Sequence, residues 1–185
     1  MEATERSSVL EHLAANRERV RRAVDGLSAG QREFRSAEDR WSVIDCLEHI
    51  VLVENHILKT IERVLETSPD PAKQADVRRK DRAVLELVPD RATRVKGPPS
   101  MLPQRRWPDF EESLRQFEST RERSIEFATK TQADLRNHFF PHPILGDLDC
   151  YQWLLLLATH SERHVRQMEE VMAEPGFPRG LEASA

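Results

Sequence analysis

Glycine and cysteine are scarce in this sequence, and long apolar runs are missing. Its 185 residues include 6 glycines and 2 cysteines, Cys46 and Cys150. A strand-rich sandwich needs many glycine-containing turns, so the composition argues against that class. Two cysteines make no disulfide framework. The first residues also lack the basic stretch and apolar stretch of a secretory signal, so the expected location is the reducing cytoplasm. The longest apolar run covers residues 153–158. A membrane-spanning helix needs about 20 apolar residues, so no membrane partner is expected.

Charged residues are abundant, and they are unevenly distributed. They form 32% of the chain against 38% hydrophobic residues, and the net charge is −4. This balance suits a charge-rich helical protein with a single domain over residues 1–185. Residues 73–106 carry ten Lys/Arg and four Asp/Glu, a net of +6, which leaves −10 for the rest of the chain. An acidic body without a recognition motif predicts that nucleic acid is no partner.

Apolar side chains recur at helical spacing in several long segments. These segments cover about 7–27, 43–67, 109–130 and 150–173. Ser42 with Asp45, and Asp149 with Gln152, have the spacing of capping boxes at the starts of the second and fourth segments. The pattern predicts an all-α fold, a four-helix bundle. Loops are expected before the second and fourth helices, and an irregular tail over about 174–185.

A long, proline-rich connection, about 68–108, separates the second and third helices. A short helix around 74–87 is expected within it, and the following KGPPSMLPQRRWP is too rich in proline for regular structure. Two interpretations remain open at this point. The connection is either a solvated linker or, because of its positive charge, an anion-attracting flap beside a pocket.

Two histidines of the last helix, His160 and His164, have the i, i+4 spacing at which two imidazoles can share one metal ion. At about 100° per residue both fall in the apolar stripe with Trp153 and Leu157, so we expect them to face the bundle interior. Buried imidazoles need partners for both nitrogens, and a metal supplies one. An ordinary buried pair is the alternative. Ser161 replaces the glutamate of the HExxH zinc proteases, which excludes their mechanism.

A third metal ligand must come from another part of the chain. His49 and His56 on the second helix point away from its apolar stripe, which predicts that both are solvated. Cys46 offers a soft ligand, although a lone helical cysteine is more often a small core residue. His138 and His142 flank FFP before the last helix, where they are either exposed or at the mouth of a pocket.

Two segments share the order and spacing of a known family pattern. They are RWSVIDCLEHIVLVENHI from Arg40 and GDLDCYQWLLLLATHSERHVRQMEEV from Gly146. Together they resemble the DinB-like superfamily (the DinB and YfiT type) of metal-dependent enzymes. Its pattern has Trp-Ser at the start of the second helix, a His two turns on, and HxxxH in the last helix. The resemblance covers about residues 6–173 and implies a DinB-like four-helix bundle, up-up-down-down or related.

The resemblance also implies a metal site. It assigns His49, His160 and His164 as ligands of one divalent ion, zinc, nickel or iron, and this takes precedence over the helical wheel for His49. Three imidazoles with an open position are typical of catalytic sites. The implied function is activation of water (hydrolase) or of a low-molecular-weight thiol (S-transferase or isomerase) on a small-molecule substrate.

Catalytic residues beyond the ligands are not identified from the sequence. Glu48, Glu54 and Glu162 lie near the ligands along the chain, but carboxylates on helix surfaces are usually solvated. The lack of an acid or base favours an alternative, a non-catalytic, stress-associated bundle that binds metal or a small ligand. A homodimer is implied by the resemblance, although the sequence has no heptad seam that demands one.

Overall fold

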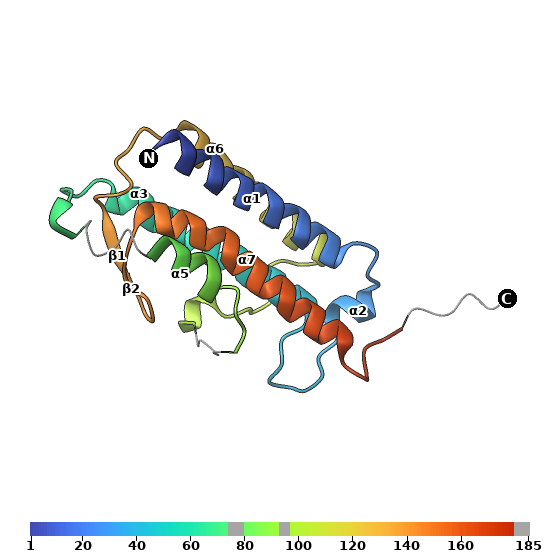
Figure 1. Cartoon of the computed structure of the whole chain (residues 1–185). Helices are drawn as coiled ribbons and strands as arrows, with labels where there is room; N and C mark the ends of the chain where they lie inside the picture. The colour runs from blue at the N-terminus through green and yellow to red at the C-terminus, as the bar shows by residue number, and fades with distance from the viewer. Residues whose placement is uncertain (74–79, 93–96, 180–185) are drawn as a thin grey trace.

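The computed structural model describes residues 1–73, 80–92 and 97–179 of the chain. Within these residues, four long helices pack side by side (Figure 1). They are α1 (Ala3–Val24), α3 (Val43–Val64), α6 (Phe110–Lys130) and α7 (Cys150–Ala173). The predicted four-helix bundle is confirmed, and α7 begins and ends where the sequence predicts. None of the described helices has the length and apolar character that crossing a membrane demands.

Shorter elements lie between the long helices. They are α2 (Ala29–Glu33), the 3-10 turns η1 (Pro71–Lys73) and η2 (Pro99–Met101), α5 (Lys80–Leu87), β1 (Phe139–His142) and β2 (Gly146–Asp149). The expectation of plain loops before the second and fourth long helices was wrong. Ser28 and Gln31 form a capping box that starts α2, and Gly146, at a φ of 66°, closes a β1–β2 hairpin. Of the helix expected over 74–87, residues 74–79 lie outside the described residues.

Both predicted capping boxes are present. The Asp45 carboxylate accepts hydrogen bonds from the backbone N–H (2.8 Å) and the hydroxyl (2.7 Å) of Ser42. Asp149 accepts from the N–H of Gln152 at 2.8 Å, and the Gln152 side chain accepts in return. The starts of α3 and α7 are therefore fixed locally, which sets the positions of side chains one and two turns further on.

α1 and α7 run in one direction, and α3 and α6 run in the other. Arg6, near the start of α1, donates to the backbone oxygen of Thr131 (2.7 Å), directly after α6. Arg136 binds Glu5 of α1 (2.7 Å) and Asp149 at the start of α7 (2.9 Å). Along the chain the order is therefore up, down, down, up, in place of the up-up-down-down order that the resemblance named first.

This topology explains the length of the connection between α3 and α6. Because these two helices are parallel, the chain must return along the bundle before α6 begins. α3 has 22 residues, which corresponds to about 33 Å of helix. In the described part of the return, α5 packs along α7 (Figure 1), and η2 packs against α3. In its described residues the connection therefore combines elements that pack on the bundle, α5 and η2, with exposed stretches such as 68–73.

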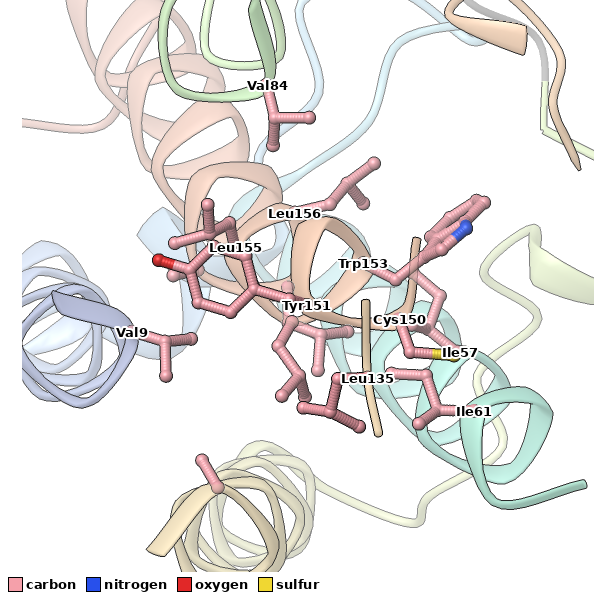
Figure 2. Close-up of a cluster of buried hydrophobic side chains, with 14 of the residues drawn as sticks. Val9, Ile57, Ile61, Val84, Leu135, Cys150, Tyr151, Trp153, Leu155 and Leu156 are labelled. Carbon is pink, nitrogen blue, oxygen red and sulfur yellow. The ribbon is translucent and has the colours of Figure 1, made fainter. Parts of the chain in front are cut away.

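A buried ion pair joins the four long helices between two apolar clusters. The cluster nearer the hairpin includes Val9, Ile57, Leu135 and Leu155, which come from different segments of the chain (Figure 2). Beyond it, a fully buried Arg121 of α6 binds both oxygens of Glu54 of α3 (2.8 and 2.7 Å). The same guanidinium donates to the backbone oxygen of Leu13 of α1 and the hydroxyl of Ser161 of α7.

Candidate metal centre

Three histidines from two helices converge just beyond this ion pair. His49 lies in the second turn of α3, and His160 and His164 lie on α7. One ligand nitrogen from each ring lies within 4.8 Å of the other two. The Nε2 atoms of His160 and His164 are 3.1 Å apart. Two nitrogens on one tetrahedral zinc ion are about 3.3 Å apart, so this spacing suits ligands of a single ion. We refer to the three residues as the histidine cluster.

Trp41 covers one side of the histidine cluster. Its ring centroid lies 4.8 Å from that of His49 and 5.9 Å from that of His164. Trp41 directly precedes Ser42, whose hydroxyl caps α3. The Trp-Ser pair therefore does two things: the serine fixes where α3 starts, and the tryptophan shields two rings of the cluster from water.

The hydrogen bonds of two rings fix their tautomers. Nδ1 of His49 lies 2.6 Å from the backbone oxygen of Met101. Nδ1 of His164 lies 3.0 Å from Oε1 of Gln167, which also accepts from Arg91 at 3.0 Å. Carbonyl oxygens only accept, so in both rings Nδ1 carries the proton and Nε2 carries the lone pair. Metal-binding histidines commonly show this arrangement, with the second nitrogen donating to a protein oxygen.

Burial keeps the cluster neutral. It lowers the pKa of His49, and it lowers the pKa of His160 and His164 well below the ordinary value. For the α7 pair, repulsion between two protonated rings of the cluster would lower the pKa further. Neutral imidazole is the form that binds a metal ion, so at neutral pH these rings need not lose protons to act as ligands.

The cluster is least covered at His160. His49 and His164 are 6% and 5% exposed, whereas His160 is partly exposed. Within the part of the chain that the structure describes, Nδ1 of His160 makes no hydrogen bond, unlike its counterparts in the other two rings. A small ligand would therefore approach from the side of His160.

Glu48 is buried, so the prediction that its carboxylate is solvated was wrong. It is 2% exposed, and it accepts hydrogen bonds from the backbone N–H groups of Gln104 and Arg105, both at 2.9 Å. The guanidinium of Arg106 adds a charged contact at 2.9 Å. All these partners belong to the connection between α3 and α6. Glu48 therefore holds the connection against α3.

The other two acidic candidates are also engaged. Glu54, expected to be solvated, is 1% exposed in its ion pair with Arg121. Glu162 stays nearer the surface and pairs with Arg19 (2.9 Å) and Arg166 (2.7 Å). These carboxylates stabilise the bundle, and neither belongs to the histidine cluster.

The remaining sequence candidates lie outside the cluster. The helical wheel was wrong for His49, which is covered by Trp41 and the connection, and right for His56, which is exposed. Cys46 is a core residue, and burial raises the pKa of its thiol. His138 lies 2.7 and 3.0 Å from two backbone oxygens, and the ring of His142 rests against Trp153.

The described basic residues of the connection take part in ion pairs and hydrogen bonds. Arg91 binds both oxygens of Glu170, at 2.6 and 2.8 Å. Lys73 pairs with Asp147 at 2.9 Å and Arg105 with Glu33 at 3.3 Å. Of the ten Lys/Arg in residues 73–106, the six that the structure describes have acidic or carbonyl partners on the protein itself. The prediction of an anion-attracting flap also concerns four basic residues outside the described part, and it stays a prediction.

The fold and the cluster define a class: helical bundles in which three histidines of two helices converge. A sequence model of the DinB superfamily matches residues 12–168, and the chain belongs to that superfamily. It is 23% identical over 146 residues to the uncharacterized protein YuaE of Bacillus subtilis (strain 168), covering 79% of this chain and 86% of YuaE. The predicted family is thereby confirmed.

A solved structure shares the fold. YfiT from Bacillus subtilis is described as a probable metal-dependent hydrolase with an unusual four-helix bundle topology. It matches with a TM-score of 0.58 and 13% sequence identity, over 93% of this chain and 88% of that one. At this identity the likeness concerns the arrangement of the helices.

Proposed function

We propose that this protein binds one divalent metal ion through His49, His160 and His164 and is a metal-dependent enzyme for a small-molecule substrate. The observation that carries the proposal is the convergence of three neutral imidazoles with ligand atoms within 4.8 Å of one another. Three histidine ligands and an open position are typical of catalytic zinc sites. Imidazole also suits nickel and iron, so these metals remain candidates.

The chain's own residues prepare this site. Met101 and Gln167 hold His49 and His164 by their Nδ1 atoms, and Trp41 keeps water from one side. A bound divalent ion supplies a Lewis acid that lowers the pKa of a water or thiol in its open position. Hydrolysis is the first candidate reaction, since the similar YfiT is described as a probable metal-dependent hydrolase. The second candidate reaction is transfer or isomerisation with a low-molecular-weight thiol, which would also use the ion as a Lewis acid.

A non-catalytic, stress-associated role in binding metal or a small ligand is the alternative. The engagement of Glu48, Glu54 and Glu162 in hydrogen bonds and ion pairs favours it, because none of the three is free to move a proton at the cluster. A bundle that only stores or senses a metal has no need of such a group.

Turnover with a defined metal separates the two functions. Zinc- and cobalt-loaded protein is offered activated esters, with and without a low-molecular-weight thiol. Turnover that requires metal and is lost in His160→Ala and His164→Ala supports the enzyme. A loaded protein that is inert, and whose cobalt spectrum does not change with ester or thiol, supports the binding role.

We also propose that the chain is a single domain, acts in the cytoplasm and forms a homodimer. The dimer is what the resemblance to the DinB-like superfamily implies, and the expected location follows from the absence of a disulfide framework. Light scattering at micromolar concentration should give the mass of two chains, and a monomer over that range would refute the dimer. No binding of DNA is expected even at low salt, where phosphate contacts are strongest.

A further inference from the structure

Residues 97–106, which we call the strap, lie directly on His49. The backbone oxygen of Met101 accepts from Nδ1 of His49 at 2.6 Å. At Gly97, a Cβ atom would lie 3.8 Å from Cε1 of the same ring. The strap therefore covers the His49 side of the histidine cluster and supplies the oxygen that fixes its tautomer.

One carboxylate holds the end of the strap. Glu48 accepts from the N–H groups of Gln104 and Arg105 at 2.9 Å, and from that of Arg106 at 3.4 Å. Three successive N–H groups can converge because Arg105 adopts a φ of 56°, in the left-handed region that residues other than glycine seldom occupy. Such a conformation persists where the surrounding contacts over-determine it, and here those contacts come from Glu48.

Arg106 joins the end of the strap to its middle. Its guanidinium binds Glu48 at 2.9 Å and donates to the backbone oxygens of Leu102 (2.9 Å) and Ser100 (3.1 Å). These oxygens flank Met101 on either side. Glu48 thus reaches the Met101 carbonyl through Arg106 as well as through the backbone, although it touches no ring of the cluster.

We propose that Glu48 is a positioning residue of the metal site. It holds the strap, the strap keeps the Met101 carbonyl on Nδ1 of His49, and the oriented ring presents Nε2 to the ion. The inference rests on the proposed metal site. Because the strap closes the His49 side, it also directs ligands toward His160. Loss of a hydrogen-bond partner of a metal-binding histidine typically lowers metal affinity about 10–100-fold.

Glu48→Gln tests this role with little change in size. The substitution replaces an acceptor oxygen by an NH₂ group that faces N–H donors, so the strap should detach. We expect zinc affinity to fall about 10-fold or more, zinc to pass faster to a chelator, and trypsin to cleave sooner after Arg105. Glu33→Gln is the matched control, because Glu33 also binds the strap at Arg105 (3.3 Å) but is 60% exposed. It should keep wild-type values.

The cobalt spectrum distinguishes positioning from a purely structural role. If Glu48 positions His49, the spectrum of cobalt-loaded Glu48→Gln should approach that of His49→Ala. A purely structural role would lower the unfolding temperature and leave the spectrum and affinity of the folded protein unchanged. Arg106→Gln, which leaves α3 intact, should weaken zinc binding in the same direction even if Glu48→Gln does not fold.

The outcomes separate this inference from the proposed function. Wild-type zinc affinity and cobalt spectrum in the folded variants, Arg106→Gln included, would overturn the role of Glu48 and leave the metal site standing. Failure of the wild-type chain to bind zinc or cobalt would overturn the metal site itself, and the positioning role with it.

Discussion

Oε1 of Gln167 lies 3.0 Å from Nδ1 of His164, one helical turn earlier on α7. The same oxygen accepts from Arg91, a residue of the connection between α3 and α6. Met101, from the same connection, binds the corresponding nitrogen of His49. Both well-buried histidines of the cluster are therefore oriented by the long connection, one through the backbone and one through a glutamine.

Replacement of Gln167 by leucine should weaken metal binding. Leucine keeps the helix and much of the volume but removes the oxygen that fixes the His164 tautomer, so we expect a loss of about 10–100-fold in zinc affinity. Competition with a chelating dye measures it. Gln116→Leu on α6, whose side chain binds only Glu112 among the described residues, is the control and should bind zinc like wild type. Equal affinity in both variants would contradict the role of Gln167.

Breaking the buried ion pair should cost much more stability than breaking an exposed one. Arg121→Met leaves the carboxylate of Glu54 buried without its partner, which typically costs about 3–5 kcal/mol. The double variant Glu54→Leu/Arg121→Met removes both charges and should be more stable than the single one. Urea unfolding measures the free energies.

The exposed pair of Arg82 with Glu86 on α5 provides the comparison. Arg82→Gln should change the free energy of unfolding by no more than about 0.5 kcal/mol. A cost for Arg121→Met as small as that of Arg82→Gln would show that Arg121 does not hold the helices together.

Metal-free protein should lose stability as the pH falls below about 6.5, the ordinary histidine pKa. His160 and His164 have lowered pKa values because they are buried, so below that pH the unfolded chain takes up protons that the native chain does not. The double variant His160→Gln/His164→Gln should show a shallower decline. Unfolding temperatures between pH 7.5 and 5.5 give both slopes, and parallel slopes would contradict neutral, buried rings.

Asp149 changes the stability with pH in the opposite direction to the histidines, but it does not affect the comparison of wild type with the double variant. Burial raises its pKa to about 6, so its contribution to stability is present at low pH and declines as the pH rises through that value. Both proteins carry Asp149, and its effect is therefore the same in each curve.

The sequence predicts those parts of the fold that depend on residues close together along the chain. The starts of α3 and α7 follow from Ser42 with Asp45 and from Asp149 with Gln152, residues three apart. His160 and His164 could be paired because the helix itself brings side chains four residues apart together. Short elements such as α2 and the hairpin have no long periodic pattern, and they were expected to be loops.

The sequence does not predict those features that depend on contacts between segments far apart in the chain. His49 points away from the apolar stripe of its own helix, and its burial comes from Trp41 and from Met101, 52 residues further on. Only the order of motifs shared with the DinB superfamily indicated that His49 belongs with His160 and His164. Glu48 and Glu54 find their partners 56 and 67 residues away, which no periodicity can show.

The metal content of the folded chain tests the central claim most directly. Wild type, His49→Ala, His160→Ala and His164→Ala are dialysed against zinc or nickel and their bound metal is measured. His56→Ala, an exposed histidine of the same helix as His49, is the control. We predict one ion per chain for wild type and His56→Ala and a marked loss in the other three. Equal metal content in all five proteins, or none in wild type, would contradict a site built from His49, His160 and His164.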